Sequence, residues 1–178
     1  MSWNDRSRHF AGPSLKSGNY VRPIGTINGM QMDALKCYWV AIDLHRAVSI
    51  DRIGTYVSGG GGSGKLLRFM VYSDVAGVPS RLILDGGTVT ANSTGPQEVT
   101  VSKALPLDRV WLAMVSDGTP TVAAQQTHGM VGNSDLTSVT NTANGCYIAT
   151  LADLTAPDPA PTLSSGPNTA PMAAMRIV

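Results

Sequence analysis

The chain has 178 residues, of which 43% are hydrophobic and only 14% are charged, and its formal net charge is +1. This near-neutral balance provides no field to attract nucleic acid or an anionic membrane, so we expect neither as a partner. The length suits one well-buried domain, and the nearly exclusive use of Asp over Glu, with Glu98 as the only Glu, argues against a helical protein.

Residues 1–30 combine polar residues, Gly and Pro with isolated aromatic residues and show no sustained periodicity. We therefore expect an extended N-terminal arm, with a short edge strand near Tyr20. Trp3, Phe10 and Tyr20 are candidate assembly anchors, because an aromatic side chain in a polar segment often buries itself in a neighbouring subunit. The first ten residues contain no apolar signal segment, and no run reaches a membrane-spanning length, so we expect synthesis in the cytoplasm and no membrane insertion.

The next segment, residues 35–73, predicts three strands. They are expected at 35–44, 48–57 and 66–73, with the glycine run 59–64 joining the last two. In the third strand, successive side chains alternate in the period of two that sends neighbours to opposite faces of a sheet. We expect the glycine run to be a strand connection in which glycine supplies positive φ.

Further strands follow at short, turn-punctuated intervals. The sequence predicts a strand at 81–90 that is broken or bulged at Gly86 and Gly87, and another at 97–101. The run 107–115 is apolar on both faces, so we expect a central strand that is covered on both sides. Cys37 and Cys146 both lie in strand-like apolar runs, and we expect two buried free thiols.

The C-terminal third is less regular. Residues 125–144 are polar and contain glycine, and a loop of that length is usually functional or wraps a neighbour. A strand is expected at 146–149, a Pro-, Ser- and Thr-rich excursion at 152–171, and a closing strand at 171–178. The candidate receptor-contact residues of this region are Asp117, Gln125, His128, Asn133 and Asp135.

About eight short strands without a convincing helix predict an all-β fold. We expect residues 31–178 to form an antiparallel β-sandwich of the jelly-roll type, with a barrel as the alternative.

Several of these stretches together resemble a known family. The segments 46–54, 67–74 and 77–80, and then 84–89, 93–95, 98–101 and 111–115, are similar to a β-sandwich domain that recurs in bacteriophage tail-fibre and other virion surface proteins. The similarity covers residues from about 20 to 124, and the ending 171–178 also fits. The matching positions specify architecture more than activity.

The resemblance implies a virion appendage domain, often trimeric, that attaches to the host or decorates the particle. The first hypothesis is a non-enzymatic tail-fibre or surface-appendage protein that presents loops to a host receptor such as a glycan. The second is a capsid or tail decoration protein, or head fibre, that cements neighbouring subunits. The third is a polysaccharide depolymerase. The expected partners are other virion proteins, a host surface receptor and further copies of the chain, and the expected location is the virion surface.

The sequence indicates no catalytic residue, cofactor or metal site. The run 59–65 matches most of a phosphate-binding loop, but Leu66 follows the lysine and the chain enters a strand instead of a helix. The three histidines are far apart in the chain and give no zinc ligand set. The aspartates sit near predicted strand ends, where they cap turns, and do not alternate closely as calcium ligands do.

Overall fold

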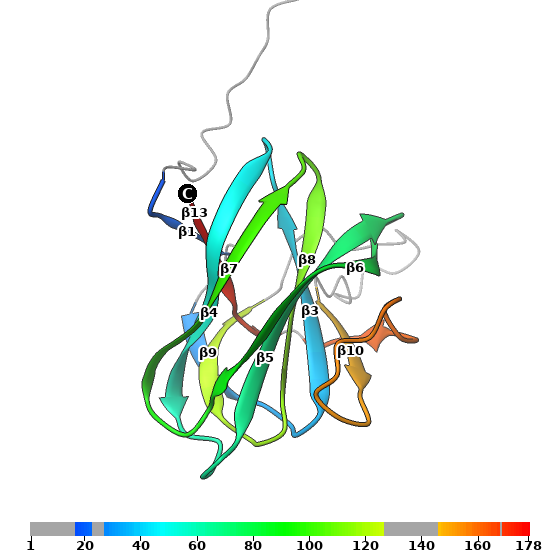
Figure 1. Cartoon of the computed structure of the whole chain (residues 1–178). Coiled ribbons are helices and arrows are strands. Elements are labelled where there is room, and N and C mark those ends of the chain that lie inside the picture. Colours follow the sequence, from blue (N-terminus) through cyan, green and yellow to red (C-terminus); the bar gives the residue numbers. More distant parts are fainter. Residues whose placement is uncertain (1–16, 23–26, 127–145, 168) are drawn as a thin grey trace, which may run out of the picture.

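The computed structural model describes residues 17–22, 27–126, 146–167 and 169–178, and within these ranges thirteen strands form two sheets and no helix occurs (Figure 1). The strand pairs are antiparallel, and the sheets pack face to face. The predicted all-β antiparallel sandwich is confirmed, whereas its jelly-roll connectivity stays a prediction. Consistent with this architecture, the described part of the chain holds no helix capable of spanning a membrane.

One layer, which we call the β4 sheet, is built around the twelve-residue strand β4. Its strands run in the order β1, β13, β4, β9 and β12, while β7 also pairs with β4 and β2 with β9. The bounds are β1 Tyr20–Val21, β2 Ile27–Gln31, β4 Val48–Gly59, β7 Gly95–Leu105, β9 Thr121–Gln126, β12 Thr169–Pro171 and β13 Ala174–Ile177.

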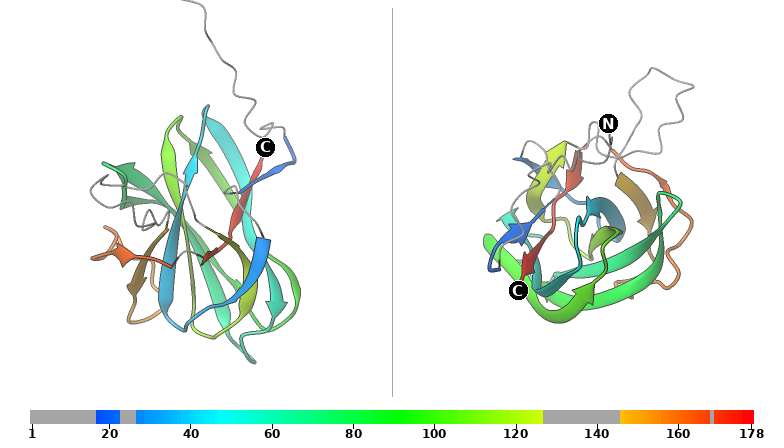
Figure 2. Two further views of the ribbon diagram at one scale, coloured as in Figure 1. Left: turned by 180° about the vertical axis from the view of Figure 1, so that it is seen from behind. Right: turned by 90° about the horizontal axis from the view of Figure 1, so that it is seen from above.

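The second layer, the β8 sheet, runs in the order β11, β10, β3, β8, β5 and β6. The bounds are β3 Lys36–Asp43, β5 Leu66–Val75, β6 Val78–Thr90, β8 Arg109–Ser116, β10 Cys146–Thr150 and β11 Ser164–Ser165. The views from behind and from above show how the long strands β6 and β7 curve along one side of the molecule (Figure 2).

The core lies between the two sheets and follows from strand alternation. Ile53 and Val57 of β4 meet Phe69 of β5 and Leu112 of β8 in one cluster, and each is at most 2% exposed. Burial of such side chains stabilises the fold by roughly 1.5 to 3 kcal/mol each relative to exposure. The sandwich is therefore held mainly by the inward-facing half of each strand.

A second cluster covers the outer face of the β8 sheet. Residues 151–163, which we call the strap, lay Leu154 and Leu163 over an aromatic surface that includes Trp39, Tyr72 and Trp111. Strand β8 is thus buried on both faces, as its two-sided apolar pattern predicts.

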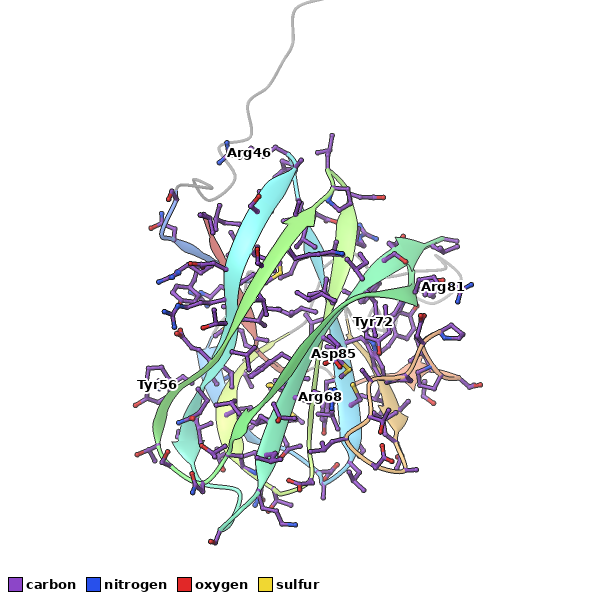
Figure 3. All side chains as sticks on the ribbon, viewed as in Figure 1. Arg46, Tyr56, Arg68, Tyr72, Arg81 and Asp85 are labelled. Carbon is purple, nitrogen blue, oxygen red and sulfur yellow. The ribbon has the colours of Figure 1, made fainter. Side chains whose placement is uncertain are left out.

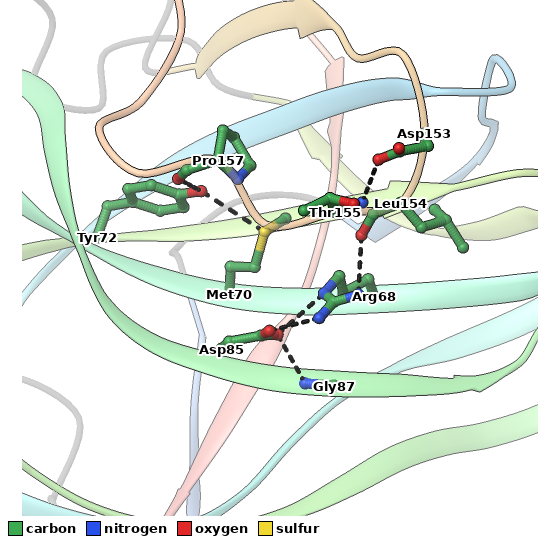
Figure 4. A network of polar contacts seen from close by, with 9 residues as sticks. All are labelled: Arg68, Met70, Tyr72, Asp85, Gly87, Asp153, Leu154, Thr155 and Pro157. Carbon is green, nitrogen blue, oxygen red and sulfur yellow. Dashed lines mark hydrogen bonds and ion pairs between the residues drawn. The ribbon is translucent and has the colours of Figure 1, made fainter.

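Polar contacts hold the strap in place (Figure 4). Arg68 Nη1 donates to the Leu154 carbonyl over 2.9 Å, while the same guanidinium forms an ion pair with Asp85. The Tyr72 hydroxyl donates to the Pro157 carbonyl over 2.7 Å. These bonds give partners to two strap carbonyl groups at half-buried positions.

The strand boundaries refine the sequence expectations. The expected count of about eight is too low, because short segments such as β11 and β12 lie in Pro-, Ser- and Thr-rich sequence that reads as loop. The bulge expected at the glycine pair is confirmed, since Phe69 pairs with Gly87 and Met70 with Asp85, which leaves Gly86 as the extra residue. The predicted edge strand at Tyr20 is β1, which pairs with β13.

The range 1–30 contains two strands that belong to the sandwich. Strand β1 pairs with β13 and β2 pairs with β9, so both are part of the β4 sheet. Residues 1–16 and 23–26 lie outside the described residues, and the arm stays a prediction.

The glycine run connects β4 to β5 directly, as expected. Gly62 and Gly64 have φ values of +106° and +72°. A Cβ at Gly118, on the neighbouring connection, would lie 2.5 Å from the Gly61 carbonyl oxygen. The run is therefore a tightly packed crossover between the sheets and leads into a strand.

Candidate binding face

The outer face of the β4 sheet is set by the register of four strands. Ala174 of β13, Gly54 of β4 and Glu98 of β7 lie opposite one another across neighbouring strands. The adjacent rung, which contains Ile53 and Val99, faces the core. Because neighbours on a strand point to opposite faces, the rung of Gly54 and Glu98 faces outward.

Two tyrosines stand on this outer face. Tyr56 lies two residues beyond Gly54 on β4, opposite Pro96, and is 54% exposed. Tyr20 of the edge strand β1 is 41% exposed. These are the two exposed aromatic side chains of the described residues.

Between the tyrosines the surface is hollowed, with a volume of about 210 Å³. We call this surface the tyrosine face. It is lined by Tyr20, Gly54, Thr55, Tyr56, Pro96, Glu98, Met172 and Ala174.

The hollow depends on glycine at its floor. A Cβ at Gly54 would lie 2.6 Å from both the Gln97 carbonyl oxygen and Glu98 Cγ. Any larger residue would displace the Glu98 side chain from its position above β4. Thr55 donates to the Met172 carbonyl over 2.6 Å, which fixes the chain segment between β12 and β13 along one side of the hollow.

Glu98 is the charged group of the hollow. The Tyr20 hydroxyl donates to Glu98 Oε1 over 2.5 Å, and Arg52 Nη1 lies 3.5 Å from Glu98 Oε2. Burial raises the pKa of Tyr20, and the hydrogen bond to Glu98 and the carboxylate charge raise it further. Tyr20 thus stays a neutral donor that orients the carboxylate.

A second ion pair borders the face. Arg176 donates to Asp51 through Nε over 2.8 Å, and this hydrogen bond lowers the pKa of the Asp51 carboxyl. Asp51 is the extra residue of a bulge in β4 relative to β13, because Arg52 pairs with Arg176 and Ile50 with Ile177. The pair therefore lies beside Tyr20, which is opposite Arg176 across β1 and β13.

The tyrosine face and the strap lie on different sides of the molecule. Tyr56 stands beside β4 and β7, whereas Tyr72, Arg81 and Asp85 lie beside β5 and β6 (Figure 3). The ion pair of Arg68 and Asp85 contacts the strap, and burial raises the pKa of Tyr72. We assign this second polar network a structural role.

The structure describes two of the expected receptor-contact residues, Asp117 and Gln125. Asp117 Oδ1 accepts from the Leu66 backbone nitrogen over 2.7 Å, so this carboxylate caps the start of β5. Gln125 belongs to β9, which pairs with β2 and β12, and the expectation that the loop begins at Gln125 is corrected. Strand pairing on both sides extends β9 to Gln126.

The remaining expected contacts, His128, Asn133 and Asp135, lie outside the described residues, as do the anchors Trp3 and Phe10. Among the anchors, Tyr20 is described, and it contributes to the tyrosine face.

Sequence reasoning missed Tyr56, and the bulge at Asp51 explains why. Counting in steps of two from the buried Val48 and Ile50 places Tyr56 toward the core. The bulge shifts the phase, so that Ile53 and Val57 point inward and Tyr56 points outward. Within β4 the apolar residues change from even-numbered to odd-numbered positions, and this change is the sequence signal that reveals the bulge.

Other chemistry-bearing groups are buried or dispersed. Cys37 and Cys146 are free and buried, as expected, and burial raises the pKa of the Cys146 thiol to about 12. Within the described ranges, no three His, Cys, Asp or Glu side chains are grouped to hold a metal ion.

Comparison with known proteins adds a fold-level similarity. No family model and no curated protein matches the chain. A similar solved structure is that of the cysteine protease and lectin-like domains of Cwp84, a surface layer associated protein of Clostridium difficile. The similarity covers 83% of this chain and 33% of that one, with a TM-score of 0.47 and 14% sequence identity, so this chain spans about a third of that structure's length.

Proposed function

We propose that this protein is a non-enzymatic attachment protein that binds a receptor on a bacterial surface through the tyrosine face. The observation that carries the proposal is the pair of exposed rings, Tyr20 and Tyr56, on either side of a hollow that contains the Glu98 carboxylate. Tyrosines are frequent anchors of binding surfaces, because a rigid ring offers a large contact area and its hydroxyl a polar contact. Both rings are exposed, so a receptor can reach them.

The proposed setting is the surface of a bacteriophage virion, as a tail-fibre or other appendage protein. This part of the proposal depends on the resemblance of the strand sequences to virion surface domains. Residues 1–16 would then contact other virion proteins, while the β4 sheet presents its outer face to the host. A trimer is the proposed assembly.

Binding of the labelled, purified chain to a panel of bacterial strains tests this function. We expect saturable binding to susceptible strains and competition with adsorption of the parent virion. Tyr56→Ala should reduce binding about tenfold, the equivalent of one well-packed aromatic contact. The matched control is Leu107→Ala, since Leu107 is 62% exposed and does not line the hollow.

Absence of binding to every strain that the virion infects would refute the attachment function. Release of soluble oligosaccharide from those cells would instead identify a depolymerase.

A second candidate function is decoration of the capsid or tail. The observation that favours it is the exposure of Tyr20, one of the expected assembly anchors, on the edge strand β1. Deletion of residues 1–16 separates the two functions, and it leaves the paired strands β1 and β2 intact. A decoration protein that is held by residues 1–16 as well as by Tyr20 should bind particles more weakly after the deletion, whereas a receptor-binding protein keeps its binding to cells.

A further inference from the structure

The tyrosine face has the size and shape for one ring of a larger ligand. Its volume is about 210 Å³. A cavity of about 150 Å³ is enough to hold benzene, so the hollow matches a single six-membered ring with its substituents. Drug-sized and cofactor ligands usually occupy larger sites, of about 300 to 1,000 Å³.

The walls of the hollow combine apolar area with a few oriented polar groups. The phenol ring of Tyr56, the ring of Pro96 and the side chain of Ala174 supply apolar surface. A ligand that fits these walls has an apolar face and a polar edge.

Glu98 in the hollow and Arg52, which pairs with it from outside the lining, supply the polar edge. An ionised carboxylate has about four acceptor positions, and the two contacts of Glu98 to Tyr20 and Arg52 leave others for a ligand. The side chain of Glu98 is 27% exposed and that of Arg52 is 38% exposed, so ligand hydroxyl groups can reach both. A guanidinium has five N–H donors in a fixed plane.

The carboxylate in the hollow disfavours an anion placed beside it. Among the described residues, Glu98 is the one charged residue that lines the hollow, and a ligand carboxylate or sulfate next to it would meet a like charge in a partly desolvated site. The cations Arg52, which pairs with Glu98, and Arg22, whose Nη1 lies 3.4 Å from Met172 Sδ, stand at the margin of the hollow. A neutral polyol avoids this repulsion and satisfies the carboxylate with hydroxyl donors.

We propose that the tyrosine face binds one uncharged hexopyranose residue of a surface polysaccharide. The C–H face of the sugar ring lies against Tyr56, and its hydroxyl groups donate to Glu98 and accept from Arg52. This inference deepens the proposed attachment function and rests on it. It names the chemistry of the receptor that the attachment function leaves open.

Titration of the full chain with defined oligosaccharides tests the inference by NMR and calorimetry. The probes are neutral hexaoses of glucose, galactose and mannose, together with a galacturonic acid hexaose as the charged counterpart. We expect at least one neutral hexaose to bind and the acidic one to bind about tenfold more weakly or not at all.

Three variants locate the binding. Tyr56→Ala should weaken binding of the neutral hexaose about tenfold, because the ring contact is removed. Glu98→Gln should weaken it by a similar factor, because charge-assisted hydrogen bonds are lost. Leu107→Ala should bind as the parent chain does. Sedimentation of each variant checks that the oligomeric state is unchanged.

Binding of the acidic hexaose alone, or neutral binding that survives both tyrosine-face variants, would overturn the inference. So would a change of oligomeric state in Tyr56→Ala, because the face would then be an interface between copies. If no hexaose binds while Tyr56→Ala still loses cell attachment, the sugar assignment fails and the attachment function stands. If the parent chain itself does not bind cells, both the sugar assignment and the attachment function fail.

Discussion

Glu98 and Tyr20 come from strands that are far apart in sequence, yet their side chains meet above β4. The contact works because Gly54, between them in the sheet, has no side chain to separate them. The chain's single glutamate thus has a fixed position, held by a phenol donor on one side and by Arg52 on the other. A preorganised carboxylate binds a ligand hydroxyl without first losing side-chain entropy.

The first prediction concerns the pKa of Tyr20. Replacement of Glu98 by Gln removes the carboxylate charge that helps to raise this pKa, while burial, the largest cause, remains. We therefore expect the pKa of Tyr20 to fall part of the way to its ordinary value. NMR titration of the tyrosine ring carbons measures it, with Leu107→Ala as the control. An unchanged pKa in Glu98→Gln would show that the two side chains do not meet in solution.

The second prediction concerns alkaline pH. Burial raises the pKa of Tyr38 to about 12 and also raises that of Tyr72. Both exceed the unfolded value of about 10, so the contribution of these groups is fully present below about pH 10 and is lost as pH rises through the folded pKa values. Urea unfolding at a series of pH values should show that the contribution of these groups to the free energy of unfolding is constant up to about pH 10 and declines above it.

Tyr72→Phe provides the control for that titration. At neutral pH it should cost about 1 kcal/mol, because the hydrogen bond to the Pro157 carbonyl is lost. Above about pH 10 its stability should decline less steeply than that of the parent chain. Equal slopes for the two proteins would contradict the assignment of Tyr72 to a buried, neutral state.

At the scale of elements, the crossover from β4 to β5 is a place where two backbone segments approach closely. A Cβ at Gly118 would lie 2.5 Å from the Gly61 carbonyl oxygen and 2.8 Å from Lys65 Cγ. Gly118→Ala should therefore destabilise the protein by about 2 to 4 kcal/mol, as forced backbone shifts and overpacking do. Chemical denaturation measures the loss.

Gly64→Ala is the matched control in the same crossover. Gly64 has positive φ but open space at its Cβ position, so the substitution should cost about 1 kcal/mol from backbone strain alone. If both variants lost the same stability, close approach of the two connections would not explain why position 118 requires glycine.

The two central strands of the β8 sheet could be predicted from sequence because each is a continuous apolar run. The strands expected at 35–44 and 107–115 correspond to β3 and β8, and the two-sided apolar pattern of β8 indicated cover on both faces. What supplies that cover could not be predicted. The strap has the composition of a loop, and its role depends on Leu154 and Leu163 meeting Trp39 and Trp111, which lie far away in sequence.

The candidate site was less accessible to sequence reasoning than the fold. Tyr20 was singled out as an aromatic residue in a polar segment, but its partner Glu98 is set by the pairing of β1, β13, β4 and β7. Tyr56 faces outward because the bulge at Asp51 shifts the alternation of β4. Long-range register and a one-residue irregularity therefore decide the site, and local periodicity reports neither.

At the scale of the whole molecule, the two sheets have different outer surfaces. The strap covers the β8 sheet, whereas the β4 sheet leaves Tyr20 and Tyr56 exposed. A sandwich with one covered and one open face is suited to contact through the open face.

The assembly prediction follows from the resemblance to virion surface domains. We expect sedimentation equilibrium of the purified protein to show an oligomer of three chains, with the tyrosine face accessible in each chain. Tyr56→Ala should leave the sedimentation behaviour unchanged. A monomer at micromolar concentration would contradict the trimer.

The central claim is that the tyrosine face contacts the receptor, and hydroxyl-radical footprinting tests it most directly. The protein is oxidised with and without surface polysaccharide extracted from a strain that it binds. Tyr56 and Tyr20 report on the face, while Leu107 and Val75, which are 62% and 56% exposed, serve as internal references away from the hollow. We predict that polysaccharide protects both tyrosines from oxidation and leaves Leu107 and Val75 unchanged; protection of the references with continued oxidation of Tyr56 would contradict the claim.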